Sequence, residues 1–382
     1  MENLKYFLLF LLSLINVKIK GTDDFFKDYM SLENTSNIRG IFVWMILISH
    51  YKSYYKTKKS YVCNKILSYL GQRMVSLFLF YSGYGIIESL KKKGNNYIIQ
   101  LPRKSLILFI KFQIILLIFL FNNMILGIPF IFKQYALSII FKQSLGNSNW
   151  FAFTIISLYL YSFISFVFIK NKKFFFVGIL FINIIVFLHA FLTYNYFYPK
   201  KNYSVDNLLC FIIGIYYSIL KQVLDKIFMK SDILYFGNVT IIIIIYYYFY
   251  NNSYINIYYI SITNGLFSII IILISMKIRF SNEFLINLNN HSYSIYLLQR
   301  VIMRYIHQKK LINDYEFIRF IIIFTSILFI SNIFDKYTSF IDIFLKPNVN
   351  SHKKIQKLSF FGIDKENSEL IYNPSKNNMN NI

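Results

Sequence analysis

An arginine and a histidine lie eleven positions apart in the first long apolar stretch of the chain, as Arg39 and His50 in IRGIFVWMILISHY. On an α-helix this spacing makes about three turns and a rise of about 16 Å, so the two side chains share one face. Arginine binds phosphate or carboxylate oxygens with a fork of N–H groups. Histidine can take a proton from a hydroxyl and return it near neutral pH. The pair therefore suits transfer of an acyl group from a phosphorylated donor to a hydroxyl.

The segments that must hold this pair are long and apolar enough to cross a membrane. The 382 residues are 56% hydrophobic and 20% aromatic, and residues 150–169 carry no charge. Because a bilayer core takes about 20 apolar residues per helix, the pattern predicts an all-α, polytopic transmembrane bundle of about ten spans. We expect the spans near residues 38–55, 74–90, 104–121, 150–169, 174–194, 207–220, 232–250, 254–276, 290–306 and 317–335.

One transmembrane domain accounts for most of the chain. We expect it over residues 31–346, between an N-terminal segment, 1–30, and a polar, Asn-rich tail, 347–382. The apolar run inside the N-terminal segment is too short for a comfortable span and could be a signal-like region or an interfacial anchor. The connection 122–149 is the longest between spans and could hold a re-entrant or interfacial helix.

The formal net charge of +24 is distributed over loops. Lys and Arg residues between apolar spans are typical of membrane topology and headgroup contact, whereas a nucleic-acid-binding protein gathers them on one face or arm. Loop counts on the two sides are nearly equal, and the Lys-rich termini favour placing both ends in the cytoplasm. Two cysteines and five scattered histidines suggest neither a disulfide framework nor a metal site. We expect the lipid bilayer as a partner, and no nucleic acid and no metal.

Polar groups interrupt three further spans. The run Ser82, Gly83, Tyr84 lies in the second span, where glycine admits either a neighbouring helix or a ligand, and on spacing alone helix packing is favoured. Trp150 opens another span, as an interfacial residue often does. The helix at 291–307 interleaves apolar residues with polar ones and should face a protein interior or a wet cavity, because lipid would penalise its Ser292, Ser294, Gln299, Arg300 and Arg304.

In this order, these segments resemble acyltransferase family 3, polytopic membrane enzymes, typically of ten helices, that acylate cell-surface carbohydrates. The resemblance covers roughly residues 30–335. It rests on four segments, SLENTSNIRGIFVWMILISHY, FYSGYGII, NSNWFAFTIISLYL and NHSYSIYLLQ. The matching positions are Arg39 and His50 in the first, Phe80, Ser82 and Gly83 in the second, Trp150 and Tyr159 in the third, and Ser292, Tyr296 and Leu297 in the fourth.

The chain departs from the family pattern at several positions. Many members carry an acid shortly after the tryptophan, but residues 151–157 hold none. Many carry an Arg-x-x-Arg pair after the second helix, whereas here Arg103 is followed by Leu106, with Lys104 as a substitute cation. Gln299 stands where the last motif often ends in histidine, as it also does in some relatives. The extracellular esterase-like domain of two-domain members is not part of the sequence.

The resemblance implies transfer of an acyl group, most often acetyl from acetyl-CoA, to a hydroxyl of an envelope carbohydrate at the plasma membrane. His50 would act as the base or carry the acyl group briefly, while Arg39 would hold the surroundings of His50 or the donor. Arg103 and Lys104 would attract the phosphates of coenzyme A. The residues expected along the substrate path are Ser82, Gly83, Tyr84, Trp150, Tyr159, Tyr296 and Gln299.

Two alternatives stay open from the sequence. A transporter or flippase for a lipid-linked glycan would also use polar groups inside a bundle, although such folds often contain inverted repeats and none is visible here. A non-catalytic membrane partner is the other alternative, because the acid after Trp150 is missing.

Overall fold

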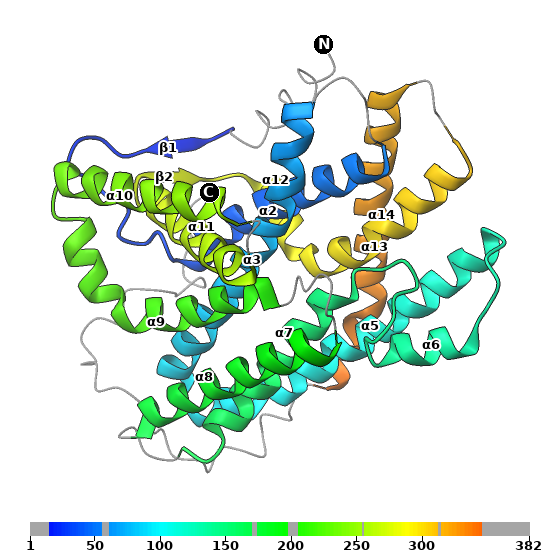
Figure 1. Cartoon of the computed structure of the whole chain (residues 1–382), viewed down its shortest axis with the longest axis horizontal. Coiled ribbons are helices and arrows are strands. Elements are labelled where there is room, and N and C mark those ends of the chain that lie inside the picture. Colours follow the sequence, from blue (N-terminus) through cyan, green and yellow to red (C-terminus); the bar gives the residue numbers. More distant parts are fainter. Residues whose placement is uncertain are drawn as a thin grey trace, which may run out of the picture.

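The computed structural model describes residues 15–55, 61–169, 174–197, 205–253, 256–311 and 315–345, with the backbone alone for 61–70. The described chain is an all-α bundle with a single pair of short strands (Figure 1). Most of the short apolar run near the N-terminus and the whole Asn-rich tail lie outside these residues.

Each segment predicted to span the membrane forms a helix, which confirms the predicted fold class. In the described part of the chain, seven helical segments are both long and apolar enough to cross a bilayer. The three other predicted spans are α2, α3 and α13, and each carries polar groups along its length. The ten helices are α2 (Leu32–Tyr54), α3 (Tyr61–Lys93), α5 (Gln100–Ile125), α7 (Asn149–Phe166), α8 (Phe175–Leu192), α9 (Val205–Phe228), α10 (Asp232–Asn251), α11 (Ile257–Lys277), α13 (Ser292–Gln308) and α14 (Glu316–Phe344).

Shorter elements connect these helices. They are α4 (Asn95–Ile98), α6 (Phe132–Ile139), α12 (Glu283–Asn290) and a π-helical turn, η2 (Thr193–Phe197). The α6 helix lies in the 122–149 connection, and its 8 residues are too few to cross a bilayer. The polar start of α3 is helical from Tyr61, about a dozen residues before the predicted beginning of that span, because a helix continues beyond its membrane-embedded part.

The two strands join the N-terminal segment to the end of α11. Strand β1 (Val17–Ile19) pairs antiparallel with β2 (Ile278–Phe280), so that Val17 lies opposite Phe280. The sequence does not predict these strands, because three residues are too few to show an alternating pattern. After β1, the side chains of Phe25, Phe26 and Tyr29 are buried against the bundle. The part of residues 1–30 that the structure describes therefore packs on the transmembrane helices.

The helices α2 and α3 pack against each other in the middle of the molecule (Figure 1), in opposite directions, because Ser49 of α2 lies against Gly71 of α3 whereas Phe42 contacts Phe78. The ring of Phe42 on α2 contacts Phe78 and Tyr81 on α3. On one flank α9 packs on α3, and α11 and α10 follow outward, to the left in Figure 1. On the other flank α13 and α14 pack beside α2, and α5, α7 and α8 form the lower part of the view.

Glycines allow α3 and α9 to approach until their backbones touch. A Cβ atom at Gly83 would lie 2.1 Å from the carbonyl oxygen of Phe211, and one at Gly214 would lie 2.1 Å from that of Phe80. Small residues at matched positions permit this close packing in membrane helices. Gly83 therefore serves helix packing, the role that its spacing favours.

The outer surface of the bundle is apolar. Only 6% of the most apolar 18-residue stretch of α10 is buried. Ile244 and Tyr247 on this helix are each 63% exposed. A soluble protein does not expose a helix of this kind to water, so this surface faces lipid. The chain is an integral membrane protein.

Candidate active site

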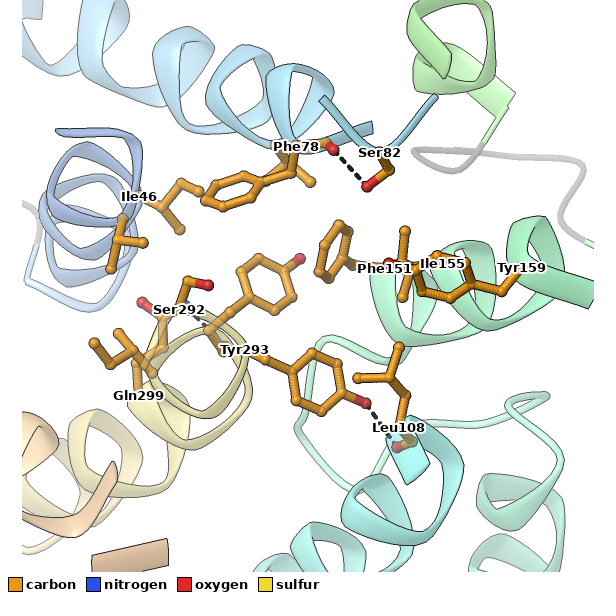
Figure 2. A pocket seen from close by; sticks show the side chains of 14 residues that line it. Ile46, Phe78, Ser82, Leu108, Phe151, Ile155, Tyr159, Ser292, Tyr293 and Gln299 are labelled. Atoms are coloured by element: carbon orange, nitrogen blue, oxygen red, sulfur yellow. Dashed lines mark hydrogen bonds between the residues drawn. The ribbon is translucent and has the colours of Figure 1, made fainter. Parts of the chain in front are cut away.

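A cavity of about 160 Å³ lies along one face of α2. Val43 and Ile46 line it, and Figure 2 shows Ile46 at its edge. Arg39 lies one turn before Val43, and His50 lies one turn after Ile46, so the four residues form one stripe of the helix. Arg39 and His50 are therefore on the face of α2 that borders the cavity, one on each side of Val43 and Ile46, although neither of them lines it.

Five helices meet around the cavity, namely α2, α3, α5, α7 and α13 (Figure 2). The lining is largely apolar and aromatic, with a few hydroxyls and one amide. Its residues are Val43, Ile46, Val75, Phe78, Ser82, Leu108, Phe151, Ile155, Tyr159, Ser292, Tyr293, Ile295, Tyr296 and Gln299. Such a cavity, apolar with few convergent polar groups, is typical of a ligand site.

Three of the polar groups in the lining are held by backbone carbonyls. In Figure 2, Ser82 turns back to donate to the carbonyl oxygen of Phe78 at 2.8 Å, and Tyr293 reaches across to that of Leu108 at 2.9 Å. The Gln299 Nε2 donates to the carbonyl oxygen of Tyr296 at 2.9 Å. Its Oε1 is buried and has no partner within the described ranges. The Gln299 amide thus has an acceptor to offer to a ligand hydroxyl.

Arg39 is held at one end of the stripe by groups of its own helix. Its Nε donates to the carbonyl oxygen of Thr35 at 3.2 Å, and its Nη2 donates to Ser36 Oγ at 3.3 Å. The hydroxyls of Tyr81 and Tyr159 lie close enough to interact with it electrostatically. Among the residues that the structure describes, no carboxylate pairs with Arg39. A cation without a counter-ion inside a membrane bundle is a natural site for an anion.

His50, at the other end, pairs with an arginine of α13. The Nη2 of Arg300 lies 3.3 Å from His50 Nδ1, and the ring of Tyr296 meets the imidazole edge-to-face at 6.4 Å. A guanidinium does not lose its proton, so Arg300 donates and Nδ1 accepts. His50 is therefore neutral, with its proton on Nε2. The sequence marks Arg300 as inward-facing but gives no sign of this partner, which is 250 positions away.

The two expected donor-binding cations lie side by side in sequence but turn to different partners. Arg103 Nη2 donates to the backbone oxygen of Asp342 on α14 at 3.1 Å. Lys104 Nζ lies 3.4 Å from the hydroxyl of Tyr97 on α4 and 4.4 Å from the centre of its ring. Both cations are in the first turns of α5, close to the end of α3, and this is the end of the bundle at which Arg39 lies.

The residues expected along the substrate path divide into two groups. Ser82, Tyr159, Tyr296 and Gln299 line the cavity. Gly83 and Tyr84 face α9 instead, where the Tyr84 ring lies 6.3 Å from that of Tyr217. Trp150 packs its ring at 6.1 Å from that of Phe151 and is not part of the lining.

The fold defines a polytopic membrane protein with a cavity between five of its helices. The family model for the acyltransferase domain of acyltransferase family 3 matches residues 35–335, and the chain belongs to this family. It is a membrane acyltransferase. Comparison with curated proteins and with solved structures gives no match.

Proposed function

We propose that the protein transfers an acetyl group from acetyl-CoA to a hydroxyl of a cell-surface or envelope carbohydrate, at the plasma membrane. The observation that carries the proposal is the stripe on α2, in which Arg39 and His50 flank the two residues that line the cavity, in a membrane acyltransferase. The shared face that the sequence predicts thus borders a space that can hold a substrate.

The spacing of the two residues suits a long donor. A rise of about 16 Å along α2 keeps Arg39 and His50 from touching the same atom. In acetyl-CoA the pantetheine arm likewise separates the phosphates from the thioester. The cavity of about 160 Å³ is smaller than the roughly 300–1,000 Å³ of sites that enclose a whole ligand. We therefore assign Arg39 to the phosphate end, the cavity to part of the pantetheine arm, and His50 to the thioester.

The reaction then follows from ordinary acyl-transfer chemistry. The sugar hydroxyl oxygen attacks the thioester carbonyl carbon, the carbon–sulfur bond breaks, and coenzyme A leaves as a thiolate. His50 takes the proton of the hydroxyl and returns it to the sulfur, which leaves an ester and free coenzyme A. A brief acyl-imidazole on His50 would need the same ring lone pair. In either case Nδ1 becomes available when Arg300 turns from it toward the substrate.

Arg103 and Lys104 have the charge and the position to attract the phosphates before the arm enters. Neither has a carboxylate partner among the described residues. Their present partners are a backbone oxygen and a tyrosine, both neutral, which a phosphate would displace readily.

The test uses the full chain in nanodiscs with radiolabelled acetyl-CoA and envelope polysaccharide isolated from the source organism. Label that enters carbohydrate measures transfer. His50→Gln should lower the rate about 10²- to 10⁴-fold, the usual contribution of a positioned base. His307→Gln is the matched control, because His307 is exposed at the end of α13, contacts the rings of Tyr54 and Tyr55, and does not line the cavity.

Arg39→Ala in the same assay should weaken use of the donor. Transfer that survives both the His50 and the Arg39 substitutions would overturn the proposal. A wild-type protein that binds no coenzyme A but moves a lipid-linked glycan across vesicles would support the flippase alternative instead.

A further inference from the structure

Two arginines lie one turn apart on α13, at the His50 end of the cavity. Arg300 and Arg304 have the i,i+4 spacing at which like charges repel. In the part of the chain that the structure describes, neither has a carboxylate within ion-pair distance. Two cations without counter-ions are costly to hold among membrane helices. We therefore expect these arginines to bind an anion from another molecule.

Arg304 borders a second cavity, of about 150 Å³, at this end of the bundle. The end of α5 and the connection that contains α6 supply the rest of the lining, which includes Asn123, Gln134 and Ser144 and no acidic residue. Arg304 Nη1 donates to Asn123 Oδ1 at 3.0 Å and to the Leu145 carbonyl oxygen at 2.8 Å. These partners are neutral, so the positive charge of the guanidinium is not balanced by them.

The backbone around Arg304 is shaped to keep the guanidinium in place. A Cβ atom at Gly146 would lie 2.2 Å from Arg304 Nη1, and Gly146 has φ +110, a conformation that favours glycine. The connection therefore closes directly over the cation. Arg304 is held at a fixed position beside the second cavity.

Arg300 also has a donor to spare. Its Nη2 is used by His50, but its Nε is buried and lacks a partner within the described residues. An oxyanion that accepts a hydrogen bond from Nε would lie beside the guanidinium that contacts His50 Nδ1. The anion and the hydroxyl that reacts must then belong to the same sugar or to adjacent sugars.

We infer that the acceptor is an anionic carbohydrate, whose carboxylate or phosphate is bound by Arg300 and Arg304 while its neighbouring hydroxyl meets His50. This inference rests on the proposed function. Planar guanidinium groups recognise both kinds of oxyanion by paired, charge-assisted hydrogen bonds. The anion also attracts Arg300 away from Nδ1 of His50. An acidic sugar therefore frees the nitrogen that accepts the proton of its hydroxyl, whereas a neutral sugar does not.

The experiment compares two acceptors of the same length, an oligogalacturonate and its carboxyl-reduced, neutral counterpart, with a phosphorylated oligomannose as a third. Transfer of labelled acetyl is measured in nanodiscs for the wild type, Arg304→Gln and Arg304→Lys. We expect the wild type to favour an acidic acceptor by about tenfold to a hundredfold in kcat/KM, the effect of one or two charge-assisted hydrogen bonds. Gln should abolish this preference, and Lys should keep part of it.

Gln is shorter than Arg, and the contacts of Arg304 with Asn123 and Leu145 come from the end of the guanidinium, so size-exclusion chromatography checks that Arg304→Gln keeps the fold. Binding of the labelled oligosaccharides is also measured by equilibrium dialysis without acetyl-CoA. If acidic oligosaccharides bind but nothing is acetylated, the proposed function fails, and only the binding of an anionic carbohydrate by the two arginines stands. Equal binding and equal use of acidic and neutral acceptors by the wild type would overturn the inference.

A lipid headgroup is another source of phosphate, and the same assay separates it. Nanodiscs of phosphatidylcholine and of phosphatidylglycerol are compared. If the two arginines serve lipid, Arg304→Gln will reduce the phosphatidylglycerol that co-purifies with the protein and leave acceptor preference unchanged, which would contradict the inference.

Discussion

Arg300 on α13 donates from Nη2 to Nδ1 of His50 on α2 across 3.3 Å. The donor in this pair is fixed, because arginine keeps its proton under all ordinary conditions. The lone pair that a base needs is therefore covered by the guanidinium. Arg300 therefore determines whether His50 can act as a base, and the same guanidinium can also bind an anionic substrate.

A first prediction concerns the tautomer of His50. In protein whose histidine ring nitrogens carry ¹⁵N, His50 should show a protonated Nε2 and an unprotonated Nδ1. Its signal is assigned by its loss in His50→Gln, among the five histidines of the chain. Arg300→Gln should let both tautomers appear, because the donor that selects one is weakened. A His50 with its proton on Nδ1 in the wild type would contradict the geometry described here.

A second prediction concerns the space between Arg39 and His50. Ile46→Phe adds a ring where the cavity lies, so the protein should fold normally while the arm of the donor is excluded. We expect kcat/KM for acetyl-CoA to fall at least tenfold, which corresponds to about 1.4 kcal/mol of lost transition-state stabilisation. The control is Ile244→Phe, which changes a lipid-facing side chain on α10. Loss of activity in both variants alike would indicate a general effect on folding.

Local periodicity explains how much of this site the sequence can predict. The apolar runs locate the spanning helices, and the period of the helix places Arg39 and His50 on one face without knowledge of any neighbour. The partner of His50 is beyond such reasoning, because it depends on α13 packing against α2. The polar spacing within α13 shows that Arg300 faces inward, but it does not show which helix it meets.

The glycine run in the second span illustrates the same limit. The sequence identifies Ser82, Gly83 and Tyr84 as one polar interruption, yet adjacent residues on a helix point in different directions. Ser82 lines the cavity, whereas Gly83 and Tyr84 face α9. Assigning each of the three residues to its own surface requires the arrangement of the neighbouring helices, which the sequence of a single span does not contain.

A third prediction follows from the contact of α3 with α9. Gly83→Ala places a methyl group against the backbone of Phe211, so the two helices must separate. The expected cost is about 1–3 kcal/mol, as for other overpacked sites. Thermal unfolding in detergent should show a lower midpoint for Gly83→Ala and for Gly214→Ala, which makes the reciprocal contact with Phe80.

Gly85→Ala provides the matched control for this measurement. Gly85 is on the same helix, and nothing lies within 4 Å of the position of its Cβ. Alanine is favoured over glycine in a helix by about 1 kcal/mol, so this variant should be as stable as the wild type or more so. Equal destabilisation by Gly83→Ala and Gly85→Ala would show that the α3–α9 contact is not the cause.

A fourth prediction separates the two ends of the donor. Arg39→Gln, Arg103→Gln and Lys104→Gln each remove a cation near the end of the bundle assigned to the phosphates. The KM for acetyl-CoA should rise about tenfold per lost charge-assisted hydrogen bond. Acetyl-pantetheine lacks the nucleotide and its phosphates, so it should be used equally well by these variants and by the wild type.

The control for charge alone is Lys133→Gln, on the exposed surface of α6 away from Arg39. It should leave the KM for both donors unchanged. His50→Gln should instead lower transfer from both donors equally, because the thioester is common to them. Arg39→Gln could instead lower transfer from acetyl-pantetheine as much as from acetyl-CoA. In that case Arg39 does not bind the phosphates, and its side chain affects the reacting thioester or hydroxyl in another way.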